Sequence, residues 1–201
     1  MTISIAVTSG KGGVGKTNCA VNLSLSLTKM GKQVVLFDAD FGMANAHILL
    51  GTNPKRTAAD FLRGDADLDS ILSQGPSDLR FIAGGSGLLE LLNLDNQARY
   101  QMLQSLSDLE NQIDYLIVDT PAGASENALF FASAATVPLV VLVAEPTSFL
   151  DAYALIKAAH IEKNIRKFSV LVNMADGSAA AKKNFNKFFE ICRRFLDVNL
   201  H

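Results

Sequence analysis

Nine residues near the amino terminus combine glycines, lysines and a threonine in a spacing that suits phosphate binding. Residues 9–17 are Ser-Gly-Lys-Gly-Gly-Val-Gly-Lys-Thr, which fits the pattern Gly-x-x-x-x-Gly-Lys-[Ser/Thr]. Glycines allow successive backbone N–H groups to turn inward toward an anion, and a following helix adds the positive end of its dipole. The residues that we expect to bind the phosphates are Gly10, Gly12, Gly13, Val14, Gly15, Lys16 and Thr17.

Two side chains at the end of this loop would supply its chemistry. Lys16 offers a point charge to the β- and γ-phosphates of a nucleotide, and the hydroxyl group of Thr17 can ligate Mg²⁺. A loop of this kind must follow a strand and open a helix. Residues 3–8 form a short apolar run of strand type, and residues 17–29 have apolar residues at helical spacing without glycine or proline. The alternative is a glycine-rich turn that binds no ligand.

Three aspartates follow two further apolar runs and could serve a bound cation. Asp119 follows four apolar residues, as in the Walker B pattern, in which a carboxylate holds Mg²⁺, often through its water shell. Asp38 and Asp40 follow the apolar run at 34–37. We assign Asp38 to the metal and Asp40 to the catalytic orientation of the attacking water. The alternative is that one of this pair caps the helix that follows near Ala44.

The elements that must position these residues alternate between strand and helix along the chain. This alternation predicts an α/β fold with a doubly wound, mostly parallel sheet and helices on both faces. We expect residues 1–201 to form a single domain. The expected strands are 3–8, 34–37, 79–83, 115–118, 139–143 and 168–172, and the later helices are 97–109, 125–135, 147–161 and 179–195. Residues 51–78 are less regular, with short helical turns at 58–62 and 68–72.

Composition narrows the class of protein. The formal net charge of −2 provides no global field that would draw the chain to nucleic acid, so we expect no nucleic-acid partner. No apolar run approaches the ~20 residues that span a bilayer, and the first strand begins too early for a signal peptide. Cys19 and Cys192 lie far apart, which favours two small buried apolar residues in a reducing compartment. We therefore expect a cytoplasmic protein.

Residues 10–17, the pair Asp38-x-Asp40 and residues 119–123 together resemble the deviant Walker A ATPases of the MinD/ParA group. The resemblance implies a P-loop NTPase fold and a homodimer that sandwiches two ATP molecules with Mg²⁺. It implies that Lys11 reaches the partner's phosphates, a type of contribution worth about 10³–10⁵ in rate; the alternative is a solvated loop lysine. Asn173 matches the position that hydrogen-bonds adenine, although a turn-forming asparagine is the alternative.

Three further blocks, at residues 40–45, 81–87 and 145–157, resemble the flagellar-number regulators called FlhG, FleN or YlxH. This resemblance implies a slow, partner-stimulated ATPase that dimerises with ATP and regulates flagellar number or placement through protein partners in flagellar assembly or at the cell pole. We expect Thr147 or Ser148 to cap the helix after Pro146. His47 replaces the family's usual aspartate, and we expect a surface histidine on a short helix.

Other functions stay open at the level of sequence. A MinD-like division-site ATPase, a ParA-like partitioning ATPase and a nucleotide-binding scaffold with negligible turnover share the same motifs. The net charge speaks against the ParA-like function, which needs a basic surface. An iron–sulfur reductase related to the nitrogenase iron protein is disfavoured, because no cysteine pair lies near residues 119–123.

The resemblance also bears on the end of the chain. It implies that residues 1–201 lack the last strand and the C-terminal helices of the family, and that contact with the inner face of the cell membrane occurs only through such a tail. Residues 179–195 form an amphipathic basic segment, which could lie at a membrane surface. Because strand-like residues follow it, we expect this helix to pack against the sheet instead.

Overall fold

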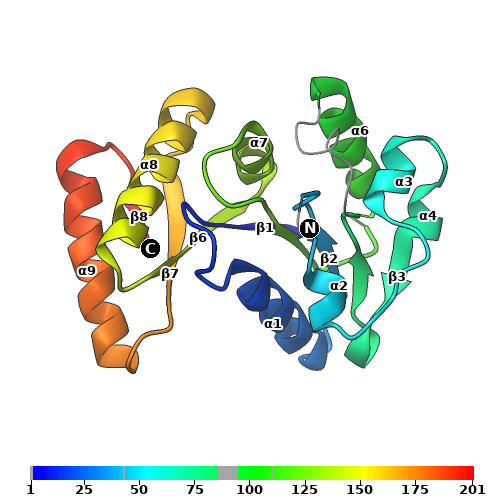
Figure 1. Ribbon diagram of the computed structural model, residues 1–201, viewed down its shortest axis with the longest axis horizontal. Coiled ribbons are helices and arrows are strands. Elements are labelled where there is room, and N and C mark those ends of the chain that lie inside the picture. Colours follow the sequence, from blue (N-terminus) through cyan, green and yellow to red (C-terminus); the bar gives the residue numbers. More distant parts are fainter. Residues whose placement is uncertain (1, 43, 86–94, 110) are drawn as a thin grey trace.

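A computed structural model describes residues 2–42, 44–85, 95–109 and 111–201. In the described residues one eight-stranded sheet runs through the molecule, in the order β3-β4-β2-β5-β1-β6-β7-β8 (Figure 1). All neighbouring pairs are parallel except β3 and β4. The strands are β1 (Ile3–Thr8), β2 (Val34–Asp38), β3 (Leu72–Gln74), β4 (Arg80–Ile82), β5 (Tyr115–Asp119), β6 (Val137–Val143), β7 (Lys167–Asn173) and β8 (Asn199–Leu200).

Helices connect the parallel strands. In the described residues they are α1 (Lys16–Lys29), α2 (Ala46–Leu49), α3 (Ala58–Leu62), α4 (Leu68–Ile71), α6 (Asn96–Ser107), α7 (Glu126–Ala134), α8 (Pro146–Lys163) and α9 (Ser178–Phe195), with a 3₁₀ turn at Pro76–Asp78. The predicted fold class is confirmed, and every apolar run that we assigned to a strand is one. Residue 43 and residues 86–87, which belong to two of the motifs, lie outside the described residues.

The sequence did not predict β3. We placed residues 68–72 in a helical turn, whereas the helix ends at Ile71 and Leu72 begins a strand that runs antiparallel to β4. This strand has three residues, Leu-Ser-Gln, and none of them is fully buried. A short, half-polar edge strand lacks the continuous apolar run that marked the central strands, so its pairing with β4 depends on tertiary structure.

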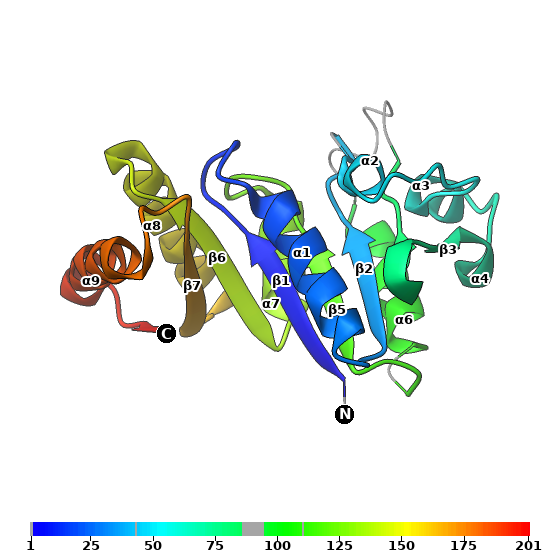
Figure 2. The same ribbon diagram turned by 90° about the horizontal axis from the view of Figure 1, so that it is seen from below.

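The two faces of the sheet are covered by different helices. Figure 2 shows α1 lying along one face, with α6 and α7 behind the sheet. On the α1 side, Val21 packs with Leu36 and Ile117 of the central strands. On the other side, Phe37 of β2 meets Phe131 of α7 edge to face, with 5.6 Å between the ring centroids. The central strands are therefore buried on both faces, as their apolar runs predicted.

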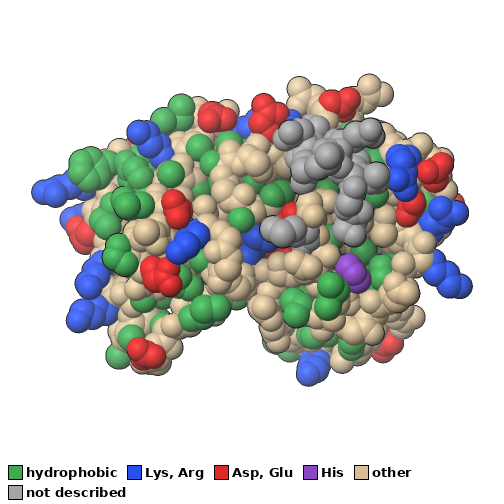
Figure 3. Space-filling model, in the orientation of Figure 1, with side chains coloured by type: hydrophobic (Ala, Val, Ile, Leu, Met, Phe, Trp, Pro, Cys, Tyr) green, Lys and Arg blue, Asp and Glu red, His purple; other side chains and the backbone are tan. Residues whose placement is uncertain are grey.

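Helix α9 packs on the domain, as we expected. Phe188 and Cys192 are fully buried, and Phe188 meets Phe149 of α8 with ring centroids 5.7 Å apart. Other apolar side chains of α8 and α9 stay exposed, and Figure 3 shows them gathered over this end of the molecule. Within the described chain, every helix is too short or too polar to cross a bilayer. Cys19, which we expected to be buried, is only half-buried on α1.

Candidate functional site

The carboxyl ends of β1, β2 and β5 meet at one edge of the sheet. The register pairs Val7 of β1 with Asp119 of β5, and it pairs Asp119 with Asp38 of β2. Figure 2 shows the loop after β1 and the short helix α2 after β2 at this same edge. In an open parallel sheet, ligands bind beyond the carboxyl ends of the strands. Three of the sequence-predicted segments, at residues 10–17, 38–40 and 119–123, are thus brought together by the topology.

Three glycines of the glycine-rich loop are required by its backbone. Two have positive φ angles, two have no room for a Cβ atom, and Gly15 belongs to both pairs. Gly13 and Gly15 have φ angles of +79° and +84°, a region that favours glycine. A Cβ atom on Gly10 would lie 2.1 Å from the backbone of Asp151 in α8, and one on Gly15 would lie 2.5 Å from Nδ2 of Asn173. At Gly12 a Cβ would meet nothing within 4 Å, so this part of the loop faces open space.

Lys16 and Asp119 form a buried ion pair below the loop. Nζ of Lys16 donates to Oδ1 of Asp119 at 2.6 Å, and the two side chains are 8% and 1% exposed. Burial raises the pKa of Asp119, and the Lys16 ammonium together with a hydrogen bond from Thr17 partly offsets the rise. Lys16 therefore begins α1 with its charge aimed at the metal-ligand candidate, which is the place where phosphate oxygens and a cation would have to meet.

Asp38 and Asp40 differ sharply in their surroundings. Asp38 is fully buried and accepts hydrogen bonds from the backbone N–H groups of Asp40, at 3.1 Å, and of Ala46, at 3.0 Å. Burial, with the Asp119 carboxylate nearby, raises the pKa of Asp38 to about 7. The Asp40 side chain is half-buried, accepts a hydrogen bond from the N–H of Gly42 at 3.3 Å, and lines the open cavity.

These contacts bear on the two roles that we considered for the pair. Asp38 ties down the first residue of α2, which is the helix-capping alternative, and its metal role stays a prediction. Asp40 has the access to the cavity that a water-orienting group needs. The structure adds that the two aspartates differ in burial, which their spacing of two residues does not show.

Lys11 extends from the loop toward the start of α8. Its Nζ donates to Oε2 of Glu145 at 2.8 Å and to Oγ1 of Thr147 at 3.1 Å. The ion pair is exposed, with side-chain exposures of 39% for Lys11 and 58% for Glu145. The sequence did not predict Glu145 as a partner of Lys11, because 134 residues separate them. The proposed reach of Lys11 toward a second subunit stays a prediction.

The predicted cap of α8 is wrong. The N-cap position belongs to Glu145, whose side chain makes no cap hydrogen bond. Thr147 instead accepts from Lys11, and Oγ of Ser148 accepts from the N–H of Val143 at 3.1 Å. Both hydroxyl groups thus fasten the start of the helix to its surroundings. His47 does lie on the short helix α2, but it is half-buried, and its buried Nδ1 has no hydrogen-bond partner within the part of the chain that the structure describes.

Asn173, the adenine-contact candidate, lies against the other side of the loop. It ends β7, and its Nδ2 donates to the carbonyl oxygen of Val14 at 2.8 Å. The next residue, Met174, has a left-handed backbone with φ of 51° and lines the same cavity as Gly15. The loop is therefore bordered by a polar amide and an exposed apolar side chain, which together offer a hydrogen bond and a surface for a base.

A cavity of about 510 Å³ opens above the loop, and its lining includes Gly12, Gly13, Lys16, Thr17 and Asp40. This volume suits a small-molecule ligand. Oδ2 of Asp119 is buried and has no hydrogen-bond partner among the described residues, so an oxygen atom with free lone pairs is available there. The available donors are carboxylate and hydroxyl oxygens, which fit Mg²⁺.

The described residues contain no group of three or more His, Cys, Asp or Glu side chains that would hold a metal ion by themselves. A magnesium ion at this edge would therefore need phosphate oxygens and water as further ligands, which is how Mg²⁺ is usually bound in nucleotide sites. Thr17 and Asp119 are the residues that fit the ion, and Asp38 lies beside Asp119 on the neighbouring strand β2.

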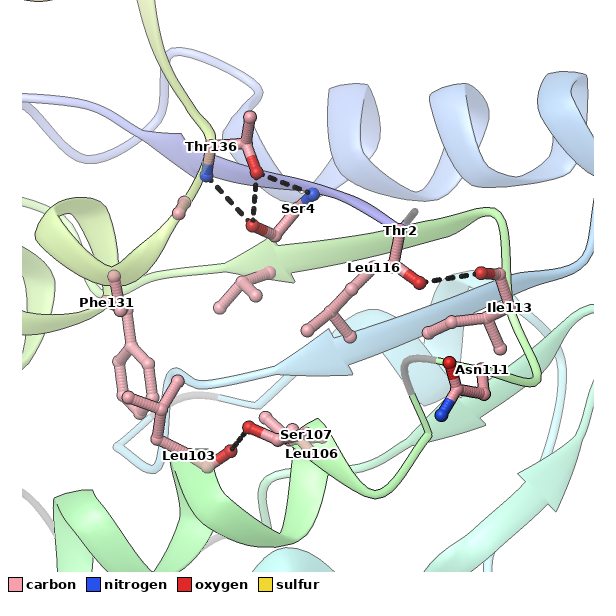
Figure 4. Close-up of a pocket in the computed structure, with 13 residues that line it drawn as sticks. Thr2, Ser4, Leu103, Leu106, Ser107, Asn111, Ile113, Leu116, Phe131 and Thr136 are labelled. Atoms are coloured by element: carbon pink, nitrogen blue, oxygen red, sulfur yellow. Dashed lines mark hydrogen bonds between the residues drawn. The ribbon is translucent and has the colours of Figure 1, made fainter.

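A second cavity lies at the opposite edge of the sheet, below the amino-terminal ends of β1 and β5. Figure 4 shows it between α6 and α7, with Leu103, Leu106 and Phe131 pointing into it and with Ser4 and Thr136 bonded to each other at its rim. Its volume is about 260 Å³, and none of the described residues that line it carries a charged side chain. A phosphate-bearing ligand needs cationic or N–H donors, so the cavity above the loop is the candidate site.

The comparisons with known proteins agree with this geometry. The family model of the CobQ/CobB/MinD/ParA nucleotide binding domain matches residues 5–198. Antiactivator FleN of Pseudomonas aeruginosa is 43% identical over 98% of this chain and 70% of its own length. Flagellum site-determining protein YlxH of Helicobacter pylori is 32% identical over 98% of this chain and 67% of its own length.

Solved structures share the fold. The septum site-determining protein MinD of Pyrococcus horikoshii, complexed with Mg-ADP, superposes with a TM-score of 0.75. It is 23% identical, and the match covers all of this chain and 79% of that protein. At this level of identity the likeness concerns the fold alone, while the family model spans nearly all of the chain. This chain therefore belongs to the CobQ/CobB/MinD/ParA nucleotide binding domain family.

Proposed function

We propose that this chain is an ATPase that dimerises when ATP and Mg²⁺ are bound and that regulates the number or placement of flagella. The observation that supports it best is that the two lysines of one loop differ in burial. Lys16 is buried with Asp119 beneath the loop, whereas Lys11 lies on the exposed side in a pair that water reaches. A lysine on the open side is placed to serve a second subunit, which a buried lysine is not.

The residues at the carboxyl edge would share the reaction as follows. The N–H groups of residues 10–17 surround the phosphates, and Lys16 neutralises charge on the β- and γ-phosphates. Mg²⁺ would supply charge stabilisation on the transferring group, held by Thr17 and Asp119. Asp40 orients the attacking water from the wall of the cavity. Lys11 of one subunit compensates the charge that develops at the other, in the manner of an arginine finger.

The biological role in this proposal rests on the relatives. One is named an antiactivator and another a flagellum site-determining protein. We propose that this chain likewise acts in flagellar assembly or at the cell pole, that its partners read the dimeric state, and that partners stimulate a slow intrinsic turnover. In this proposal it works in the cytoplasm, and any contact with the inner face of the membrane uses a segment beyond residue 201.

The test measures mass and phosphate release in the same samples. The wild type, Lys11→Ala and Asp40→Ala are compared by light scattering with ADP and with ATP, each with Mg²⁺. We expect the wild type to double its mass with ATP and Mg²⁺ but not with ADP and Mg²⁺. Both variants should bind nucleotide and should release phosphate at least about a hundredfold more slowly. A trans-acting cation such as Lys11 is worth about 10³–10⁵ in rate, and a group that handles the attacking water, such as Asp40, is worth about 10²–10⁴. Arg193→Ala, which breaks an exposed ion pair on α9, is the matched control.

Two results would contradict parts of this proposal. A Lys11→Ala protein that hydrolyses ATP at the wild-type rate as a monomer would exclude the trans role of Lys11. A wild-type protein that binds ATP and dimerises but never releases phosphate, even with flagellar partners added, would leave the nucleotide-binding scaffold as the function.

A MinD-like role in selecting the division site is the second candidate. It is supported by a MinD relative from Synechocystis that is 34% identical over 84% of this chain and 63% of its own length. Deletion of the gene separates the two: we expect altered flagellar number with normally placed septa, and minicells with normal flagella would favour the MinD-like role.

A further inference from the structure

Arg99 is a cation buried between two helices outside the phosphate site. It belongs to α6 and is only 5% exposed. Its three donor groups all find acceptors: Nε donates to Oδ1 of Asn127 at 2.8 Å, Nη2 to Oε2 of Glu126 at 2.7 Å, and Nη1 to Oδ1 of Asn96 at 3.1 Å. A buried guanidinium group is costly unless it is paired in this way. An apolar side chain at position 99 would make none of these three contacts.

Two of the three acceptors are the first two residues of α7. This helix starts three residues after the carboxylate loop, residues 119–123, and Ser125 caps it by accepting from the N–H of Ala128. The carboxylate loop is tied to the glycine-rich loop at residues 10–17, the proposed phosphate loop, because the N–H of Gly123 donates to the carbonyl oxygen of Ser9 at 2.8 Å. A continuous path of hydrogen bonds and short chain segments thus links the phosphate loop, the carboxylate loop, the first turn of α7 and α6.

Helix α6 is held in place by contacts other than those of Arg99 as well. The helix has its own cap, since Asp95 accepts from the N–H of Ala98 at 2.7 Å, and it buries Met102 and Leu106 against the sheet. Two of the three polar contacts of Arg99 go to α7, and the third, to Asn96, stays within α6. Asn127 is 2% exposed, whereas the side chain of Glu126 is 79% exposed. The acceptor on Asn127 therefore lies in the interior, whereas the acceptor on Glu126 lies at the surface.

We propose that Arg99 is a positioning residue for the nucleotide site. It fastens the first turn of α7 to α6, so that the carboxylate loop, which includes Asp119, moves together with α6 when nucleotide binds and leaves. The inference rests on the nucleotide cycle proposed above. It adds a residue that touches neither phosphate nor metal and that lies on a different helix from every residue assigned to the site.

The experiment uses hydrogen exchange and turnover on the same proteins, with and without Mg-ADP. Arg99→Met removes the charge and keeps most of the volume, and Arg99→Lys keeps the charge. Glu126→Gln alters the exposed acceptor alone and leaves the buried contact with Asn127 intact. Arg193→Met is the matched control, because it removes an arginine from an exposed pair on α9.

We expect Mg-ADP to protect residues 119–127 and 96–101 together in the wild type. In Arg99→Met, protection should persist at 119–123 and disappear at 96–101. The affinity for Mg-ADP should stay within about twofold, while turnover falls about tenfold, since displacements far from the chemistry can cost up to about a hundredfold. Arg99→Lys should recover part of both losses, and Glu126→Gln should show a smaller effect in the same direction.

The outcomes separate this inference from the proposed function. If Arg99→Met shows the wild-type exchange pattern and turnover, the inference is wrong whatever the function. If the wild type binds Mg-ADP without any turnover, the ATPase proposal fails, and the exchange pattern alone decides the role of Arg99. If Arg99→Met does not fold, Glu126→Gln and Arg99→Lys decide it, and wild-type behaviour of both would overturn the inference. Absence of protection at 96–101 in the wild type would also overturn it.

Discussion

The two lysines of the phosphate loop lie five residues apart and are held in opposite ways. Lys16 and Asp119 are 2.6 Å apart in the interior, with exposures of 8% and 1%, whereas Lys11 and Glu145 are 2.8 Å apart at exposures of 39% and 58%. Nearly equal distances thus hide different energetics. A buried pair is expensive to break, because it strands a charge, and an exposed pair is worth little. The loop therefore has one lysine built into the domain and one that can exchange partners.

The largest test of this comparison removes the buried cation. Lys16→Met should lower the free energy of unfolding by about 3–5 kcal/mol, because Asp119 is left buried without the cation that stabilises its carboxylate. The double variant Lys16→Met with Asp119→Leu should regain most of that loss, because no charge is then stranded. Urea unfolding without nucleotide measures both. Equal free energies of unfolding for the wild type and Lys16→Met would show that the pair contributes nothing to stability and would contradict this comparison.

A neutral core position gives the scale for these charge effects. Phe188 of α9 is fully buried, and Phe188→Ala should cost about 3–5 kcal/mol, the usual loss for a truncated core phenylalanine. Because no charge is involved, the loss should not change with pH or salt. If the variant melts like the wild type but no longer binds liposomes, α9 acts at a membrane instead of in the core.

The acidic side of the buried region should reveal itself through pH. The pKa of Asp38 is about 7 in the folded chain, against 3.8 for an ordinary aspartate. At pH values between these two, the folded state therefore holds a proton that the unfolded state has lost. Its contribution therefore favours folding below pH 4 and is lost as the pH rises through 7, by up to about 4 kcal/mol. Asp38→Asn, measured without metal or nucleotide, should gain stability relative to the wild type as the pH rises from 5 to 8. A constant difference across this range would contradict the raised pKa.

The smallest effect is expected at the exposed pair. A double-mutant cycle with Lys11→Met and Glu145→Gln should give a coupling of at most about 1 kcal/mol, and less in high salt. In the proposed cycle Glu145→Gln should also favour the ATP-bound dimer, because Lys11 loses its ion pair and keeps the hydrogen bond to Thr147. A coupling energy of several kcal/mol would mean that Lys11 is held as firmly as Lys16, and its transfer to a second subunit would then be implausible.

Much of the site was predictable because its residues are close in sequence or follow apolar runs. The loop at residues 10–17 is a local pattern, and Asp119 is marked by the apolar strand that precedes it, so the order of residues suffices to locate both. The separate roles that we assigned to Asp38 and Asp40 stay predictions, and their difference in burial could not be predicted from a spacing of two residues. The partners of Lys11 could not be predicted either, because contacts across 134 residues leave no local pattern.

By itself the sequence determined the glycine-rich loop, the alternation of strands and helices and the family, since each depends on local spacing or on continuous apolar runs. Only the tertiary structure decided which charges are buried and which face water. It joined β3 to the sheet, brought Glu145 to Lys11, and closed Arg99 between α6 and α7. The physical reason is that burial and the pairing of distant charges are set by how the helices pack on the sheet, and no short stretch of residues specifies that packing.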